Sequence, residues 1–170
     1  SYFSELDKIN TYYCQALLKK KYLNYRELIR IRKISNILKK NNFKNLIKKK
    51  YDRGYYFEYE NYFKKKIGKN ISGKLHIGRS RNDLDSAISK LILRKNLKKN
   101  LLSQFLLLEK IFKKFSKNDA IFPFYTQNQF SSFLTVKHYF NSSILSFVDY
   151  IKKITQKRNF LYECPLGACG

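Results

Sequence analysis

The residues best suited to bind a ligand lie in one short segment, Gly73–Asp83, with the sequence GKLHIGRSRND. It places Arg79, Arg81 and Asn82 directly before an apolar repeat that is typical of a long helix. Guanidinium groups and the free N–H groups at a helix start both bind carboxylates. Because Asn82 carries a donor and an acceptor, it is suited to a substrate with an amine beside its carboxylate. The spacing leaves a second interpretation open, in which this is a basic turn whose Asn82 only caps the helix.

The apolar repeat predicts a long helix from Asp83 to about Phe115, because leucine, isoleucine and phenylalanine recur at steps of three and four without Gly or Pro. A second long helix is expected from about Phe130 to Lys157, separated from the first by Pro123 and the polar run 125–128. Its predicted buried face consists of Phe133, Val136, Phe140, Ile144, Phe147, Ile151 and Ile154. Alternating apolar residues are nearly absent, so the predicted fold class is all-α.

The first seventy residues predict shorter helices separated by lysine-rich breaks. Their apolar positions recur at helical spacing in two rows, Tyr13, Leu17, Leu18 and Leu23, then Leu28, Ile31, Ile34 and Leu38. A third helical piece, 58–67, ends at Gly68. The later long helices are apolar on more than one side, notably at 106–108, so helices from other subunits or from elsewhere in the polypeptide are expected to cover them.

The charge balance favours a polyanionic partner at first sight. The chain has 170 residues, with 36 Lys or Arg against 12 Asp or Glu and a formal net charge of +24. A basic helical nucleic-acid-binding module, with its aromatic residues stacking on bases, is therefore the alternative function. However, Lys, Ile, Asn, Phe and Tyr make up 87 of the residues, and all five have A/T-rich codons, whereas Arg occurs only 8 times. We therefore interpret the lysine excess as compositional drift, and clusters 48–50 and 64–66 as solvated faces.

The cysteines and histidines predict no metal site. Three cysteines and two histidines provide no zinc-binding spacing, which favours a reducing, cytoplasmic compartment. Cys164 and Cys169 are expected to be buried small residues. His76 is expected to have a structural role, and His138 to form a core or intersubunit hydrogen bond. No apolar run approaches the roughly 20 residues of a membrane-spanning helix, and no signal segment opens the chain.

Three segments in order resemble the argininosuccinate lyase family of the fumarase/aspartase superfamily. Gly73–Asp83 is similar to the family's Gly-Lys-Leu-His-Thr-Gly-Arg-Ser-Arg-Asn-Asp at ten of eleven positions, with Ile77 in place of Thr. Pro123–Gln129 resembles Pro-Gly-Tyr-Thr-His-Leu-Gln, and His138 matches a histidine in the helix that follows. The segment 164–169 resembles the family's Cys-Pro-Leu-Gly turn. The resemblance covers roughly residues 54 to 170.

The resemblance implies cleavage of argininosuccinate to arginine and fumarate by β-elimination, without metal or cofactor. It also implies a homotetramer whose long helices form a central bundle and whose active sites combine three subunits. Residues 1–80 would form part of the N-terminal helical domain, and 81–170 would begin the bundle domain. Ser80, Arg81 and Asn82 would bind the substrate. Thr126 and Gln129 would line the pocket, and Thr126 and Gln127 would stand at catalytic positions.

Departures from the family pattern concern the proton-transfer groups. Gln127 replaces the family's acid/base histidine, and an amide does not exchange protons near neutral pH. The family's Gly-Ser-Ser-x-Met-Pro loop, which carries the serine base, is not among the 170 residues, and the chain has no Met. We therefore expect a fragment or the product of a decayed gene, inactive on its own.

Overall fold

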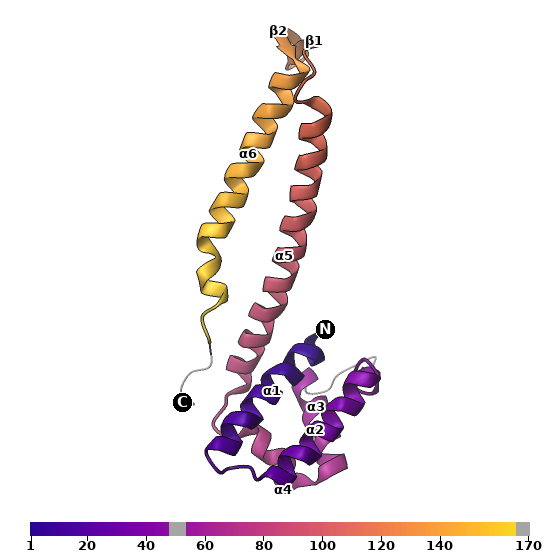
Figure 1. Ribbon diagram of the computed structural model, residues 1–170, viewed down its shortest axis with the longest axis vertical. Coiled ribbons are helices and arrows are strands. Elements are labelled where there is room, and N and C mark those ends of the chain that lie inside the picture. Colours follow the sequence, from indigo (N-terminus) through magenta and orange to yellow (C-terminus); the bar gives the residue numbers. More distant parts are fainter. Residues whose placement is uncertain (48–53, 166–170) are drawn as a thin grey trace. The chain divides into compact units, whose positions relative to one another are not determined.

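The computed structural model of the chain describes residues 1–47 and 54–165, which form two units (Figure 1). The first unit comprises Ser1–Ile92 with the segment from Cys164, and the second comprises Leu93–Glu163. Six α-helices and one β-hairpin are present in the described part of the chain. A mostly helical fold is thus confirmed, and the hairpin is the exception to the all-α prediction. The domain boundary expected near residue 80 stays a prediction.

The first unit is a cluster of helices around one apolar core. Its elements are α1 (Tyr2–Lys19), α2 (Tyr25–Lys40), α3 (Tyr55–Ile67), α4 (Lys69–Gly73) and the start of α5 (Arg81–Phe115), with short 3-10 turns at Lys44–Leu46 and Lys74–His76. The apolar rows predicted for the first seventy residues supply much of the core, including Leu17, Leu23, Leu28, Ile31 and Leu38. Leu84 and Ile88 are fully buried, which anchors the start of α5 in this core.

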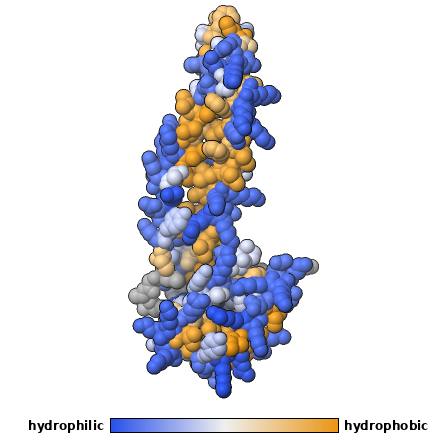
Figure 2. All heavy atoms as spheres, viewed as in Figure 1, coloured by the Kyte–Doolittle hydropathy of each residue, from blue (hydrophilic) through white to orange (hydrophobic). Residues whose placement is uncertain are grey.

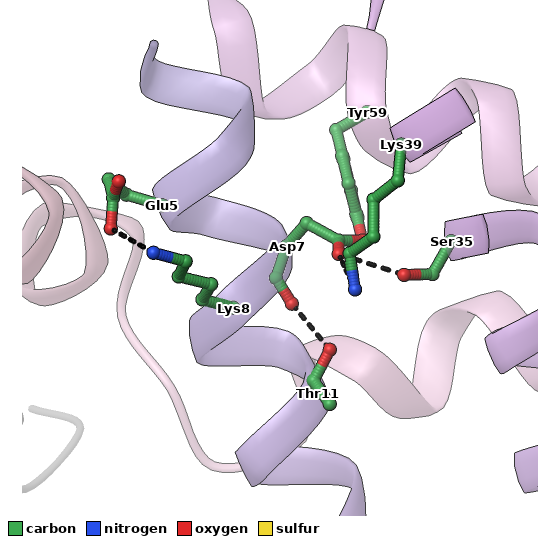
Figure 3. Close-up of polar contacts among 7 residues, drawn as sticks. All are labelled: Glu5, Asp7, Lys8, Thr11, Ser35, Lys39 and Tyr59. Carbon is green, nitrogen blue, oxygen red and sulfur yellow. Dashed lines mark hydrogen bonds and ion pairs between the residues drawn. The ribbon is translucent and has the colours of Figure 1, made fainter. Parts of the chain in front are cut away.

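A buried polar cluster joins three helices of the first unit (Figure 3). Asp7 on α1 is 1% exposed, and its carboxylate accepts hydrogen bonds from the Ser35 hydroxyl (2.8 Å) and the Tyr59 hydroxyl (2.7 Å). Lys39 Nζ lies 3.0 Å from the same carboxylate. Because a buried charge is costly unless it is paired and hydrogen-bonded, these partners from α2 and α3 hold the helices in one arrangement.

The second unit consists of the later part of α5, a hairpin and α6 (Val136–Gln156), followed by a 3-10 turn at Lys157–Leu161. Strands β1 (Ile121–Thr126) and β2 (Gln129–Thr135) are antiparallel, and the hairpin connects the two antiparallel helices at one end (Figure 1). The stacked rings of Phe115 and Phe140, with centroids 4.0 Å apart, join the helices near the hairpin.

The predicted start of the second long helix at Phe130 is wrong, because residues 129–135 form a strand. Gln127 and Asn128 have positive φ angles of 49° and 62°, as in the two-residue turns that match the twist of paired strands. Phe122 and Phe124 alternate with exposed residues and contact the Tyr139 ring. The helix begins only after Thr135, whose hydroxyl accepts a hydrogen bond from the His138 backbone N–H.

Most apolar side chains of the second unit face solvent in the described structure. No residue of α6 is buried, and of the predicted buried face Phe133 and Phe147 are 65% and 45% exposed. Figure 2 shows apolar side chains gathered along this unit. Leu102, Phe105, Leu106 and Leu107 on α5 are exposed as well. The other five residues of that face are half-buried, so the predicted face is only partly covered in the chain by itself, because two helices cannot enclose each other's apolar sides.

Candidate anion-binding pocket

The start of α5 lines a cavity of about 800 Å³ in the first unit. Its aromatic walls are Tyr2, Tyr55, Tyr56 and Phe57. Its polar lining residues are His76, Arg79, Ser80, Arg81, Asn82, Asp85 and Ser89. The three predicted substrate-binding residues of the Gly73–Asp83 segment, Ser80, Arg81 and Asn82, therefore share one pocket.

Ser80, not Asn82, occupies the cap position of α5. The helix begins at Arg81, and the Ser80 hydroxyl accepts a hydrogen bond from the Asn82 backbone N–H at 3.3 Å. The interpretation of Asn82 as the cap is therefore wrong, because Asn82 lies in the first turn of the helix, whereas a cap residue precedes that turn. The Asn82 side chain is exposed at the pocket and is available to a ligand.

The turn before α5 is held by contacts with α1 and α2. Gly78 has a φ of +63°, a conformation that glycine adopts without strain. The Tyr13 hydroxyl donates a hydrogen bond to the Ile77 carbonyl. Lys74 Nζ lies 2.7 Å from Glu27 Oε1, and this hydrogen bond lowers the pKa of Glu27. Glu27 also forms a capping box with Asn24 at the start of α2, so the segment is attached to the first two helices.

Arg79 is a buried cation in the pocket lining. It is 5% exposed, its guanidinium carbon lies 4.1 Å from the centre of the Tyr13 ring, and burial lowers its pKa. Nη2 donates to Asn10 Oδ1 at 2.7 Å and to the Leu75 carbonyl. Nε and Nη1 are buried and have no hydrogen-bond acceptor among the residues that the structure describes. The substrate-binding set implied by the family resemblance omits Arg79, whereas the side-chain chemistry of the segment already placed it beside Arg81 and Asn82.

Arg81 and His76 each contact an aromatic side chain of α3. The Arg81 guanidinium carbon is 4.1 Å from the centre of the Phe57 ring. His76 Nδ1 is 2.9 Å from the Tyr56 hydroxyl, as expected for a structural histidine. Burial raises the pKa of Tyr56 to about 12, and burial lowers the pKa of His76. Near neutral pH the pocket therefore holds two arginine cations beside a neutral imidazole.

The remaining predicted site residues belong to the second unit. Thr126 and Gln129 pair at the end of the hairpin, Gln127 is in its turn, and all three are exposed. His138 is exposed in the first turn of α6 and has no core position in the described chain. These residues share the hairpin region, as their proximity in the sequence suggests.

Other sequence predictions have mixed outcomes. Lys64, Lys65 and Lys66 are exposed, as expected, whereas the cluster 48–50 lies outside the described residues. Cys164 is exposed, so the prediction that it is buried is wrong, and Cys169 lies outside the described residues. Within 1–47 and 54–165, no three His, Cys, Asp or Glu side chains are grouped to hold a metal ion, and no helix is long and apolar enough to cross a membrane.

Comparison with known proteins shows partial homology to argininosuccinate lyases of the fumarase/aspartase superfamily. The chain is 33% identical over 106 residues to argininosuccinate lyase of Candida albicans, covering 60% of this chain and 22% of that protein. It is 34% identical over 113 residues to the enzyme of Ehrlichia ruminantium, covering 63% and 23%. Argininosuccinate lyase 2 of Agrobacterium fabrum is 28% identical over 117 residues, covering 68% and 23%. The matched segment thus spans less than a quarter of these relatives, and no family model matches the chain.

The fold is that of part of a solved lyase. The crystal structure of EDDS lyase in complex with formate matches 98% of this chain with a TM-score of 0.80, at 23% identity and over 32% of its own length. A variant of EDDS lyase with bound fumarate matches equally well.

Proposed function

We propose that the chain is an argininosuccinate lyase-like polypeptide that contributes substrate-binding segments to the β-elimination of argininosuccinate to arginine and fumarate. The observation that supports this most is that Ser80, Arg81 and Asn82 line one pocket at the start of α5, within a segment similar to the lyase motif. The homology to argininosuccinate lyases supports the same reaction.

The elimination needs a base for the proton beside a carboxylate, donors that stabilise the resulting negative charge, and an acid for the departing nitrogen. The Arg81 guanidinium and the Asn82 amide are the donors in the first unit, and Thr126 and Gln129 of another subunit would add polar contacts from the hairpin. Gln127 cannot move a proton near neutral pH. The base is assigned to the family's serine loop, which is not among the 170 residues.

The proposal includes a homotetramer in the cytoplasm, without metal or cofactor, in which subunits cover each other's long helices. The exposed apolar side chains of Phe105, Leu106 and Phe147 support an assembly of this kind. A nucleic-acid partner is not proposed, because the charge excess follows the compositional drift rather than a defined interface.

The decisive experiment is a chimera of the Candida albicans enzyme in which the chain replaces its matched segment. We expect the chimera to release fumarate, which is followed by its ultraviolet absorbance, whereas the isolated chain should release none because it lacks the base. Arg81→Met should lower kcat/KM of the chimera by about 10²- to 10³-fold, the usual loss for a donor to a developing anion. Arg158→Met, at an exposed position of the turn after α6, is the matched control.

Two results would contradict the proposal. Turnover by the isolated chain would show that the base lies within these 170 residues. A chimera that assembles and remains fully active with Arg81→Met would show that the pocket does not bind the reacting substrate.

A further inference from the structure

The pocket at the start of α5 contains side chains of both charge signs that do not neutralise each other. Arg81 and Asp85 are four residues apart, the helical spacing at which opposite charges usually pair. Here the Arg81 guanidinium lies over the Phe57 ring, 4.1 Å from its centre, while Asp85 Oδ1 accepts a hydrogen bond from the Tyr2 hydroxyl. No ion pair between Arg81 and Asp85 occurs in the described structure. The pocket therefore keeps a cationic side and an anionic side apart.

The anionic side is built by Tyr2 and Asp85. Burial and the adjacent Asp85 raise the pKa of Tyr2 far above its usual range, so its hydroxyl remains protonated and acts as the donor. One oxygen of the Asp85 carboxylate is therefore engaged. The other oxygen has no hydrogen bond to the described residues, and the side chain is exposed at the pocket, where Ser89 follows one turn later. A ligand ammonium is the donor that fits this free oxygen.

The cationic side has its own unsatisfied donors. Arg79 lines the same cavity, is 95% buried, and leaves Nε and Nη1 without an acceptor among residues 1–47 and 54–165. An unpaired buried donor is costly, and an anionic ligand group would supply the missing acceptor. Together with Arg81 and Asn82, Arg79 makes this side suited to an anionic group such as a carboxylate.

The spacing of the two sides matches a small dipolar ligand. Residues 81 and 85 are about 6 Å apart along the helix axis at the usual rise per residue. An α-amino acid carries its carboxylate and its ammonium on the same carbon, so the two groups can contact side chains that are one helical turn apart.

We propose that this pocket binds the zwitterionic amino-acid group of its ligand, with the carboxylate on Arg79, Arg81 and Asn82 and the ammonium on Asp85. The inference rests on the proposed function in treating the pocket as the substrate site, and it adds an ammonium subsite and a ligand class. A simple dicarboxylate satisfies only the cationic side, so the pocket should discriminate against it.

L-Aspartate and succinate test this directly, because they differ by one amino group. Isothermal titration calorimetry of the 170-residue chain should give a Kd for L-aspartate about tenfold lower than that for succinate, which is the effect of one charge-assisted hydrogen bond. In NMR spectra, the ring signals of His76 should shift when L-aspartate binds, whereas those of His138 on the second unit should not. Equal affinity for both ligands, or binding of neither, would overturn the proposal.

Substitutions at Asp85 test whether its carboxylate causes the preference for L-aspartate over succinate. Asp85→Asn should reduce the preference for L-aspartate to within twofold, while Asp85→Glu should retain most of it. Asp83→Asn, two residues away and outside the pocket lining, is the matched control and should keep the full preference. A preference that survives in a folded Asp85→Asn variant would refute the ammonium subsite, and Asp85→Ala provides the same test if the amide variant misfolds. Because these measurements do not involve turnover, they fail or succeed independently of the chimera assay.

Discussion

At the scale of single residues, the first unit depends on charges that are buried with their partners. The Asp7 carboxylate on α1 is nearly inaccessible and receives hydroxyl groups from Ser35 and Tyr59 (Figure 3). Burial raises the pKa of Tyr59 well above its usual value, so this hydroxyl is always a donor to the carboxylate. Removing one donor leaves a buried charge with fewer partners, which is costly.

Tyr59→Phe should therefore lower the free energy of unfolding by about 1–3 kcal/mol, the usual loss for a hydrogen bond to a charged group. Urea denaturation, monitored by circular dichroism, measures this change in the free energy of unfolding. Tyr12→Phe removes the same hydroxyl from a 71% exposed side chain on α1 and should change stability by less than about 0.5 kcal/mol. Equal effects of the two substitutions would mean that the Asp7 cluster contributes nothing specific.

His76 makes stability depend on pH. Burial lowers its pKa in the folded chain below the ordinary value of about 6.5. The unfolded chain therefore binds a proton more readily, and stability should fall as pH decreases through about 6.5. The free energy of unfolding, measured between about pH 8 and pH 5, tests this dependence. An NMR titration of the His76 ring gives its pKa directly. His76→Gln should flatten this part of the profile. A His76 ring that titrates above the ordinary value would contradict the reasoning.

At the scale of elements, the hairpin between α5 and α6 depends on two residues with left-handed backbone. Asn128 has a φ of 62°, which glycine and asparagine tolerate and β-branched residues do not. Asn128→Val should destabilise the hairpin by about 1–2 kcal/mol, whereas Asn128→Gly should be neutral or stabilising. Amide exchange of the strand residues measures the difference. Equal protection in both variants would show that the turn does not determine the pairing.

The hairpin also shows where sequence periodicity stops being sufficient. Phe130, Phe133 and Val136 fit a helical repeat, yet the first two belong to β2 and only Val136 begins α6. Pro123 suggested a simple break, but a two-stranded ladder has an open edge on each strand and tolerates a missing N–H. The long helix α5, in contrast, runs over Arg81–Phe115, almost as its apolar rows predicted.

At the scale of the whole molecule, the two units differ in how much apolar surface they enclose. The first unit has a continuous core, whereas Leu108 and Leu161 are the buried hydrophobic residues of the second unit in the described chain. Side chains such as Leu102 and Phe105, 58% and 62% exposed, are normally covered in a stable protein. This contrast supports the proposed assembly through the long helices.

Phe105→Glu should therefore weaken self-association, because a carboxylate would have to be buried between helices. We expect the unsubstituted chain to sediment as a species larger than a monomer, and the variant to shift towards the monomer. Lys98→Glu, at an exposed position on the same helix, is the control for a change of charge. A chain that is monomeric at every concentration would contradict assembly through this surface.

The sequence by itself determined the helical class and the approximate extent of α5, because these follow from local periodicity. From side-chain chemistry it predicted ligand binding by the Gly73–Asp83 segment. It also indicated the related lyases through three short motifs. Only the tertiary structure decided that Ser80 caps α5 and that Arg79 is buried with two donors lacking an acceptor among the described residues. It also decided that Asp85 accepts from Tyr2 while Arg81 lies over Phe57. Those outcomes depend on contacts between residues as far apart as 2 and 85, which no local pattern specifies.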